Sequence, residues 1–367
     1  MPHPSLFVSA GDPSGDNATS RVISSLTLQL PDLTFFGLGG DRLKGLGQEQ
    51  LADKSDLAVL GFWEVAKRYT FFRLLMLHCV EQIHTRGPKC ILLVDYPGFN
   101  LRLAQRVRKF GIPIIYYISP QIWAWGRRRL NQIRELVDLM LVILPFERDF
   151  YKDTGVRTEF VGHYLLEDIP PDYIGSPLPN SRQLALMPGS RRQEVERMLA
   201  PMLQTAARFT RHYNSSAVVA AAADFDYDAA LRPYTGNSIT VSRDDSRKII
   251  HESDLVLTAS GTATLETGII ARPMVIMYRT GFITYQIARR LITIDKIGLV
   301  NLVLGEKAMP ELIQHEASPD RLFAELRRFA DDTAYRETAR NKLLTLPTIL
   351  GGTGASQRAA ELIGRYL

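Results

Sequence analysis

Short runs of apolar residues alternate along this chain with longer stretches in which apolar and polar positions are mixed. Each run is too short for a helix and is bounded by glycine, proline or polar residues, as buried strands are. The expected strands are Leu6–Ala10, Leu33–Leu38, Cys90–Val94, Ile112–Ile118, Leu139–Leu144, Leu184–Met187, Ala217–Ala223, Ser238–Val241, Asp254–Thr258 and Pro273–Met277. The mixed stretches suit helices, so the alternation predicts an α/β fold built on parallel strands.

The middle of the chain has a different composition. Residues 168–182 are rich in proline and have few apolar anchors, as linkers between domains do. We therefore expect one domain at 1–167 and a second at 183–350. The glycines of Gly351–Gly354 then lead into a last helix, so that 351–367 forms a C-terminal element that either packs on the N-terminal domain or is exchanged in a dimer.

One stretch departs from the alternation. Leu57–Leu77 crowds large apolar residues around a few basic ones. The large residues singled out are Phe62, Trp63, Tyr69, Phe71, Phe72 and Leu75. An amphipathic core helix is one interpretation. We prefer the other, a surface helix that contacts acyl chains or a membrane, because the apolar groups are too many for one buried stripe.

Composition narrows the class of protein. The chain has 367 residues, 46% of them hydrophobic, and a formal net charge of +5. This content excludes disorder, and the charge is compatible with an acidic substrate, an anionic membrane surface or nucleic acid. Cys79 and Cys90 have no metal-ligand spacing, which excludes a disulfide scaffold and favours the cytoplasm. We see no signal peptide and no apolar run that would span a bilayer.

Two loops of the first half carry candidate chemistry. Gly11–Asp16 is a glycine-rich turn between strand and helix, typical of nucleotide-binding α/β units but also of ordinary strand–helix connections. Asp95 follows the strand Cys90–Val94, at the edge where parallel sheets bind ligands. It is therefore placed to act as a general base. The alternative role is that of a cap for the helix expected at Leu101–Phe110.

Aromatic and basic residues gather after the strand Ile112–Ile118. Trp123 and Trp125 precede a run of arginines that begins at Arg127. Such residues stack on nucleic-acid bases, grip a sugar phosphate at a helix start, or form a solvated basic face. Because no RNA-binding motif accompanies them, we expect no nucleic-acid partner. His163, further on, is either a ligand contact or a structural histidine.

The second half opens with a strand, a turn and a helix in the sequence LALMPGSRRQEVE. Gly189 ends the strand, and Ser190 with Gln193 predicts a capping box at the helix start. Free N–H groups there suit a phosphate, and Arg191 in the first turn would add a cation to such a site. The alternative is a solvent-facing arginine at an ordinary helix start.

A second loop of small hydroxyl residues follows Asp254–Thr258. Ser260, Gly261 and Thr262 stand at a helix start and form a second candidate phosphate cradle. Other candidates near the same ligand are Glu266, Tyr278 and Arg279. The carboxylate among them suits the hydroxyl groups of a ribose.

Two further features have less certain roles. Asn301 lies in an apolar neighbourhood, so it needs hydrogen-bond partners if it is buried. Asp224, Asp226 and Asp228 alternate as the ligands of a divalent cation do, but no distal glutamate accompanies them. We favour an acidic turn that caps a helix, and leave cation binding open.

Ten short stretches, in order over nearly the whole chain, resemble the lipid-A-disaccharide synthase family. They are SAGDPSGD (Ser9–Asp16), FFGLGG (Phe35–Gly40), LAVLGFWEV (Leu57–Val65), DYPGFN (Asp95–Asn100), YYISPQIWAW (Tyr116–Trp125), LPFE (Leu144–Glu147), FVGH (Phe160–His163), LALMPGSRRQEVE (Leu184–Glu196), LTASGTATLE (Leu257–Glu266) and PMVIMYR (Pro273–Arg279). Together they are highly specific. The resemblance implies a glycosyltransferase of the GT-B type, with two Rossmann-like α/β domains that face a central crevice.

The resemblance also implies the reaction. UDP-2,3-diacylglucosamine donates its sugar to the 6-hydroxyl of 2,3-diacylglucosamine 1-phosphate, giving the β-1′,6-linked disaccharide 1-phosphate and UDP. The displacement is a single inverting step. Asp95 matches the family's proposed base, and Arg191 matches an essential arginine that can neutralise the departing diphosphate.

Other residues acquire roles from the same resemblance. The implied substrate-binding residues are Gly11, Ser14, Gly15, Asp16, Asn100, Trp123, Arg127, Gly189, Ser190, Ser260, Gly261, Thr262, Glu266, Tyr278, Arg279 and Asn301. The aromatic helix matches a membrane-association region, which implies a cytoplasmic enzyme held on the inner face of the cell membrane by surface lipids. No metal or cofactor is implied. Some family members form homodimers by exchanging C-terminal segments, which the glycines before the last helix permit.

The chain departs from the family pattern at two positions. Gly98 stands where a second acid is common, so that acid is not needed for the scheme, and Val300 replaces a common proline before Asn301. Two rivals remain. One is another enzyme on the same architecture, the peptidoglycan N-acetylglucosaminyltransferase or the UDP-N-acetylglucosamine epimerase. The other is a non-catalytic binder of lipid or nucleotide at the membrane surface.

Overall fold

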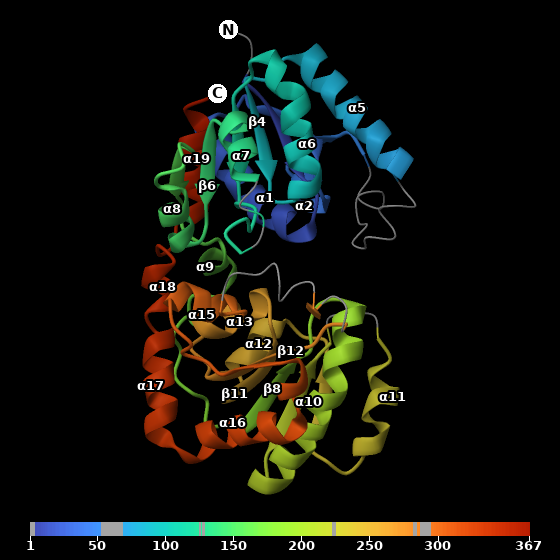
Figure 1. The fold of residues 1–367 in the computed structure, drawn as a ribbon, viewed down its shortest axis with the longest axis vertical. Helices are drawn as coiled ribbons and strands as arrows, with labels where there is room; N and C mark the ends of the chain where they lie inside the picture. Colours follow the sequence, from blue (N-terminus) through green and yellow to red (C-terminus); the bar gives the residue numbers. More distant parts are fainter. Residues whose placement is uncertain are drawn as a thin grey trace. The chain divides into compact units, whose positions relative to one another are not determined.

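The computed structural model describes residues 4–52, 69–124, 126, 129–221, 225–281, 285–286 and 295–367. Contacts divide the chain into two compact units, Met1–Tyr164 with Gly351–Leu367, and Leu165–Leu350. Each unit contains one parallel sheet with helices on both faces (Figure 1). The predicted α/β class is therefore confirmed.

The sheet of the first unit has the strand order β3-β2-β1-β4-β5-β6-β7. Its strands are β1 (Ser5–Ala10), β2 (Thr34–Leu38), β3 (Glu49–Gln50), β4 (Cys90–Val94), β5 (Ile114–Tyr117), β6 (Leu139–Val142) and β7 (Thr158–Phe160). β2 and β3 follow β1 on one side of it, whereas β4, β5, β6 and β7 are added in order on its other side. The loops after β1 and β4 therefore diverge and leave a crevice at the carboxyl edge of the sheet, where ligands bind in open α/β folds.

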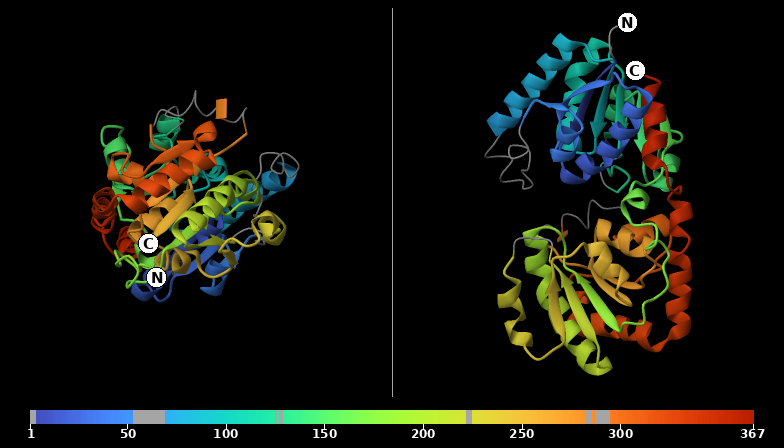
Figure 2. Two further views of the ribbon diagram at one scale, coloured as in Figure 1. Left: turned by 90° about the horizontal axis from the view of Figure 1, so that it is seen from below. Right: turned by 180° about the vertical axis from the view of Figure 1, so that it is seen from behind.

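The helices of this unit form two layers. They are α1 (Pro13–Gln29), α2 (Asp41–Gly45), α5 (Tyr69–Arg86), α6 (Pro97–Val107), the short η1 (Arg108–Phe110), α7 (Leu130–Leu136), α8 (Pro145–Tyr151) and α19 (Ala355–Gly364). α1 packs with α2 and α19, while α5, α6 and α7 pack side by side on the other face. The C-terminal helix α19, red in Figure 2, thus completes the first unit.

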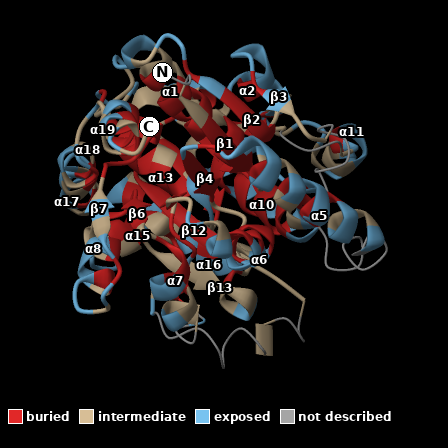
Figure 3. Cartoon of the chain, turned by 90° about the horizontal axis from the view of Figure 1, so that it is seen from above, coloured by how far each residue is buried: buried red, intermediate tan, exposed pale blue. Residues whose placement is uncertain are grey.

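Successive side chains along each strand point to opposite faces of the sheet, so apolar residues at alternating positions bury each face against the helices that cover it. Phe7, Leu93 and Tyr116 belong to a buried cluster that also includes Cys79 and Ile83 of α5. The central strands of the sheet are accordingly buried (Figure 3). One side of α5 is therefore core, as the first interpretation of the aromatic stretch required.

The second unit repeats the plan with the strand order β10-β9-β8-β11-β12-β13. Its strands are β8 (Gln183–Met187), β9 (Ser216–Ala220), β10 (Ile239–Ser242), β11 (Leu255–Ala259), β12 (Met274–Tyr278) and β13 (Glu311–Ile313). Its helices are α9 (Leu165–Asp168), α10 (Arg192–Tyr213), α11 (Tyr227–Leu231), η3 (Arg232–Tyr234), α12 (Ser246–His251), α13 (Thr262–Ile269), α15 (Leu299–Leu304), η4 (Gln314–Glu316), α16 (Pro319–Asp331), α17 (Thr333–Leu343) and α18 (Leu346–Ile349). α10 packs on α16, and α13 packs on α12, α15 and α18. The direction of the sheet reverses between β8 and β11, which creates a second crevice of the same kind.

Residues 168–182 pack as part of the second unit. Gly175 N donates to Ile269 O at 2.9 Å. The guanidinium of Arg272 is fully buried and donates to Ser176 O (2.9 Å) and to His251 O (2.7 Å). A buried cation is stable only with such partners. This stretch is therefore held against the sheet on the side of α13.

All ten strands expected from apolar runs are present, with ends that shift by one to a few residues. Three further strands, β3, β7 and β13, are not among these ten, because each has only two or three residues and pairs on one side alone, at the edge of its sheet. The apolar residues of Tyr285–Leu304 suggest one helix, but residues 295–298 are not helical and α15 begins only at Leu299.

Candidate active site

The loop between β1 and α1 is organised by two carboxylates. Asp12 caps α1, since its Oδ1 accepts a hydrogen bond from Gly15 N at 3.2 Å. Asp16 is buried and accepts from three backbone N–H groups at the start of α2, at 2.8–3.2 Å. A Cβ on Gly11 would lie 2.8 Å from Cδ1 of Tyr96, so the loops after β1 and β4 touch. The predicted ligand residues here thus also build the crevice.

Asp95 lies at the carboxyl end of β4 in a strained backbone. Asp95 and Tyr96 both have a φ of 43°, which non-glycine residues adopt only where neighbours enforce it. The carbonyl oxygen of Asp95 accepts from Tyr116 Oη at 2.5 Å and from Asn100 Nδ2 at 2.9 Å. Asn100 is itself fixed by Ser9, whose Oγ donates to its Oδ1 at 2.7 Å. The cap of α6 is Tyr96 rather than Asp95.

The electrostatic surroundings of Asp95 favour the role of a base. Burial, reinforced by the negative charge of Asp12, raises the pKa of the Asp95 carboxyl to about 6. A base is most effective when its pKa lies just below the working pH. At neutral pH the carboxyl is therefore ionised and still a stronger proton acceptor than an exposed aspartate.

Trp123 is held by a carboxyl that sequence reasoning missed. Trp123 Nε1 donates to Glu147 Oε1 at 3.1 Å, and Leu144 N donates to Glu147 Oε2 at 3.1 Å. Glu147 is 2% exposed, and burial raises its pKa to about 7. The LPFE motif carried this signal, because a glutamate three residues after the N-cap is placed to accept a hydrogen bond from the N-cap backbone N–H, as Glu147 does from Leu144 N. Of the neighbouring candidates, Trp125 and Arg127 lie outside the described residues.

The turn between β8 and α10 differs from the prediction. α10 begins at Arg192 with Arg191 as its cap, so Ser190 is not the cap and Gln193 does not close a capping box. Glu194 does so instead, because Oε2 accepts from Ser190 N at 3.1 Å and from Arg191 N at 3.3 Å. The reason is the left-handed backbone of Gly189, with φ of 116°, which turns the chain so that these amides face Glu194.

This geometry changes how a phosphate would meet the turn. Two of the amides expected to bind it already have a carboxylate partner. The guanidinium of Arg191 remains largely exposed, with Nη1 3.8 Å from Glu194 Oε1. An anion at this turn would therefore be met by the exposed guanidinium rather than by these two amides of the helix start.

The loop between β11 and α13 carries the second predicted cradle. Gly261 caps α13 and Thr262 is its first residue, as the sequence predicted. A Cβ on Gly261 would meet nothing within 4 Å, so the space in front of this turn is open. Ser260 Oγ donates to Ile297 O at 2.8 Å and so holds the segment before α15 against this loop.

Glu266 has a cationic partner that the sequence did not reveal. Arg247 Nε donates to Glu266 Oε1 at 2.9 Å, and Arg247 Nη1 donates to Asp168 O at 3.1 Å. Burial raises the pKa of the Glu266 carboxyl, and the positive charge and hydrogen bond of Arg247 partly offset this rise. The carboxylate is thus fixed in place on α13. Its contact with a ribose stays a prediction.

Asn301 is fully buried and completely hydrogen-bonded. Its Nδ2 donates to Met309 O and to Glu311 Oε1, both at 2.8 Å, and its Oδ1 accepts from Met309 N at 2.9 Å. Glu311 also accepts from Ile297 N (3.0 Å) and Gly298 N (2.9 Å). Asn301 therefore positions the segment that Ser260 contacts. Its own contact with substrate stays a prediction.

Arg279 lines a pocket of about 700 Å³ in the second unit. The other lining residues are Arg197, Thr280, Tyr285, Gln286, Gln314 and His315. Arg279 Nη2 donates to Ala317 O at 2.9 Å, while its buried Nε has no partner among the described residues. Tyr278, the last residue of β12, is not among the lining residues. Arg279 and two further basic side chains make this pocket suitable for an anion.

The predicted lipid-contacting residues are only partly described. Phe62 and Trp63 lie outside the described residues, as does the side chain of Tyr69. Phe71 and Phe72 are half-buried and pack edge to face, with centroids 5.5 Å apart.

Burial corrects the prediction at Leu75. Its side chain is 5% exposed in the core, whereas the exposed leucines of α5 are Leu74 (61%) and Leu77 (50%). Within the described part of the chain, no helix has the length and apolarity needed to cross a membrane.

The acidic turn after β9 caps a helix. Asp226 Oδ1 accepts from Ala229 N at 2.9 Å at the start of α11, as expected, whereas Asp224 lies outside the described residues. Among the described residues, no cluster of histidine, cysteine and acidic side chains is suited to a metal ion. His163 is buried, which lowers its pKa to about 3 and keeps it neutral.

Solved structures define the class of protein to which these two sheets belong. The glycosyltransferase of kitacinnamycin aligns over all of both chains with a TM-score of 0.64 at 17% identity. The S. aureus MnaA–UDP co-structure aligns over 99% of this chain and 96% of its own, with a TM-score of 0.66 at 12% identity. At these identities the likeness concerns the fold alone, and the fold is that of GT-B glycosyltransferases and related epimerases.

Sequence comparison then gives the family. The family model described as lipid-A-disaccharide synthetase matches residues 6–352. The lipid-A-disaccharide synthase of Anaeromyxobacter dehalogenans (strain 2CP-C) is 42% identical, covering 97% of this chain and 96% of that protein. The enzyme of Myxococcus xanthus (strain DK1622) is 38% identical, covering 98% and 97%. The chain belongs to the lipid-A-disaccharide synthase family and is a glycosyltransferase.

Proposed function

We propose that this enzyme transfers 2,3-diacylglucosamine from UDP to the 6-hydroxyl of 2,3-diacylglucosamine 1-phosphate. The products are the β-1′,6-linked disaccharide 1-phosphate and UDP. Family membership over residues 6–352 supports the substrates. The reaction is a single displacement that inverts the anomeric carbon.

In the proposed step, Asp95 takes the proton of the acceptor 6-hydroxyl while the hydroxyl oxygen attacks the anomeric carbon of the donor. The bond between that carbon and the diphosphate oxygen breaks, and UDP leaves with the electron pair. The guanidinium of Arg191 neutralises the charge that develops on the diphosphate. Base and guanidinium come from different units, so the mechanism requires both units in one substrate complex.

The observation that carries the proposal is the state of Asp95. Its backbone is held in a left-handed conformation by Tyr116 and Asn100, at the end of β4 beside the topological reversal of the sheet. Its carboxyl has a pKa of about 6. Strain and a raised pKa at one residue are typical of a reactive group.

For the donor, we propose that UDP is held by the loops after β8, β11 and β12. Ser260, Thr262 and Glu266 belong to this set, together with Gly189 and the pocket at Arg279. The open space at Gly261 and the buried, unpartnered Nε of Arg279 support this assignment.

We also propose that the enzyme acts in the cytoplasm, bound to the inner face of the cell membrane by α5. The exposed Leu74 and Leu77 and the exposed, basic Arg73, which precedes Leu74, support such a surface contact. Because α19 packs on α1 of its own chain, exchange of C-terminal segments between two copies is not part of the proposal.

The test is to incubate the pure protein with both lipid substrates and to weigh the product. The expected result is a disaccharide 1-phosphate together with one UDP for each disaccharide. UDP release without disaccharide would exclude the proposed acceptor.

The role of the base is tested by Asp95→Ala. Turnover is expected to fall about a hundredfold or more, the usual contribution of general base catalysis, while affinity for UDP is nearly kept. Unchanged turnover would remove Asp95 from its role. Arg191→Ala is expected to impair donor binding as well as the rate.

A further inference from the structure

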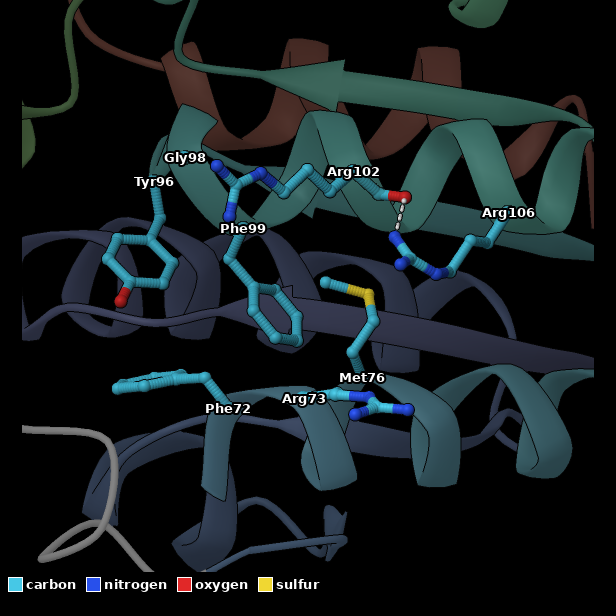
Figure 4. A pocket seen from close by; sticks show the side chains of 8 residues that line it. All are labelled: Phe72, Arg73, Met76, Tyr96, Gly98, Phe99, Arg102 and Arg106. Atoms are coloured by element: carbon cyan, nitrogen blue, oxygen red, sulfur yellow. Dashed lines mark hydrogen bonds between the residues drawn. The ribbon is translucent and has the colours of Figure 1, made fainter. Parts of the chain in front are cut away.

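A pocket of about 320 Å³ lies between α5 and α6 in the first unit (Figure 4). Its volume is at the lower end of small-molecule sites. Phe72 and Met76 of α5 and Phe99 of α6 form its apolar surface. A pocket with such a lining accommodates a hydrocarbon chain in preference to a polar molecule.

Three arginines surround this apolar surface. They are Arg73 on α5 and Arg102 and Arg106 on α6, and all three are exposed. None of them forms an ion pair with any described residue. Arg106 Nη1 donates to Arg102 O at 3.4 Å, and the guanidinium of Arg102 extends back along α6 toward Gly98 (Figure 4). Three cations beside an apolar pocket are complementary to a molecule with an anionic head and an apolar tail.

One end of the pocket reaches the loop of the proposed base. Tyr96 and Gly98 line that end, and Tyr96 directly follows Asp95. The Tyr96 ring stacks on Phe99 with centroids 6.1 Å apart, which continues the apolar surface up to the loop. From Gly98 to Arg106 the pocket follows α6 for about 12 Å. A molecule bound along it would have one end beside Asp95.

Gly98 keeps this end open. A Cβ at Gly98 would meet nothing within 4 Å, and its φ is not in the left-handed region. Neither the backbone nor close packing therefore requires a glycine in this first turn of α6. The missing side chain leaves room at the end of the pocket that faces the base.

We propose that this pocket binds one acyl chain of the lipid acceptor, with the acceptor's phosphate held by Arg102 and Arg73. The acyl chain lies on Phe72, Met76 and Phe99. This inference rests on the proposed function, since it takes the acceptor to be a diacylated sugar phosphate. It adds the place where that substrate is bound and the residues that select its phosphate.

The apolar half is tested with the same substitution at two glycines. Gly98→Phe fills the open end, whereas Gly45→Phe on α2 adds the same ring at an exposed position outside the pocket, where a Cβ meets nothing within 4 Å. We expect Gly98→Phe to raise the KM for the acceptor at least tenfold and to leave the KM for UDP-2,3-diacylglucosamine within twofold. Gly45→Phe is expected to match the parent enzyme. Equal acceptor KM values in all three proteins would overturn the acyl-chain assignment.

The phosphate half is tested with Arg102→Gln, for which Arg365→Gln, at the exposed residue directly after α19, is the matched control. A hydrogen bond to a charged group corresponds to about tenfold or more in affinity. We therefore expect Arg102→Gln to weaken binding of radiolabelled 2,3-diacylglucosamine 1-phosphate in detergent micelles about tenfold. Binding of the same lipid without its phosphate is expected not to change. An equal loss for both lipids would overturn the phosphate contact.

The binding measurement also separates this inference from the proposed function. If no disaccharide forms but Gly98→Phe and Arg102→Gln still weaken binding of the acceptor, the proposed reaction is contradicted while the pocket assignment stands. If disaccharide forms and neither Gly98→Phe nor Arg102→Gln changes its rate of formation, the proposed reaction stands while the assignment of the pocket to the acceptor is overturned. Displacement of the acceptor by phosphatidylglycerol vesicles at equal lipid concentration would show a general membrane contact and overturn the assignment to the acceptor.

Discussion

Asp95 shows how a single residue combines structural cost with function. Its left-handed backbone and its half-buried carboxyl both lower the free energy of unfolding. Tyr116 and Asn100 offset this cost by donating hydrogen bonds to its carbonyl oxygen. Strained residues of this kind cost of the order of 1–3 kcal/mol each. A residue kept under such conditions is more readily explained by reactivity than by stability.

The pH dependence of the enzyme should report the Asp95 carboxyl. Because the base must be ionised, kcat/KM is expected to fall about tenfold per pH unit below an apparent pKa of about 6. A pH–rate profile between pH 4.5 and 8 measures it. If the rate instead falls only near pH 4, the ordinary pKa range of an aspartate, the pKa of the Asp95 carboxyl is not raised by burial in solution.

Asp95→Asn should separate stability from activity. The pKa of Asp95 is raised in the folded protein, so its contribution to stability is present at pH 4 and is lost as the pH rises through 6. The uncharged variant should therefore be more stable than the parent at pH 8, by at most about 3 kcal/mol, with little difference at pH 4. Urea unfolding at both pH values measures this. A less stable variant at pH 8 would contradict the burial argument.

At the scale of elements, the strand–turn–helix units decide what each loop presents. In the turn between β8 and α10, Glu194 takes the amides that the sequence assigned to a phosphate, and Arg191 is left exposed. In the turn between β11 and α13, the space before Gly261 is open. The two similar sequence signals thus give two different turns.

Gly189→Ala tests the first of these turns. The added Cβ would lie 2.6 Å from Glu194 Oε2 in a backbone with φ of 116°, so the turn must rearrange. We expect the KM for the UDP-sugar to rise several-fold and the KM for the acceptor to stay the same. Gly45→Ala is the control, because a Cβ there meets nothing within 4 Å. A Gly189→Ala enzyme with unchanged donor KM would remove this turn from the donor site.

The exposed side of α5 can be tested without disturbing its core side. Replacing Leu74 and Leu77 together by serine removes exposed apolar area, so stability should change by no more than about 0.5 kcal/mol. The protein is expected to shift from the membrane fraction to the supernatant after cell lysis. Leu75→Ser, at the buried position, is the contrasting variant and should lower stability instead. Retention of the double variant on membranes would contradict surface binding by α5.

At the scale of the whole molecule, the last residues of the chain complete the first unit. Ala359, Ala360 and Ile363 of α19 are fully buried where this helix packs on α1. Arg358 of the same helix donates through Nε to Val161 O at 2.8 Å. The first unit therefore cannot be completed until residues 351–367 have been synthesised.

Ile363→Asp tests this dependence. A carboxylate at a fully buried apolar position should destabilise the first unit by several kcal/mol, while the second unit keeps its transition. Calorimetry is expected to show one transition shifted to lower temperature and one unchanged. Glu361→Gln, at an exposed position of α19, is the control. A uniform shift of both transitions would show that the units do not unfold separately.

The sequence by itself determined the α/β class and the strands, because buried strands require continuous apolar runs whatever surrounds them. It also determined Asp95 and Arg191 as candidates, since both follow such runs at positions that parallel sheets use for ligands. It could not give Glu194 as the cap of α10 or Arg247 as the partner of Glu266. Those contacts depend on backbone angles and on residues distant in sequence.

Only the tertiary structure decided which side of α5 is core, which of the two expected placements 351–367 takes, and that an arginine-rimmed pocket adjoins Asp95. Each of these depends on which surfaces the folded chain covers. Periodicity shows that a helix has an apolar side but not which neighbour buries it, and a cavity is a property of two elements rather than of either sequence.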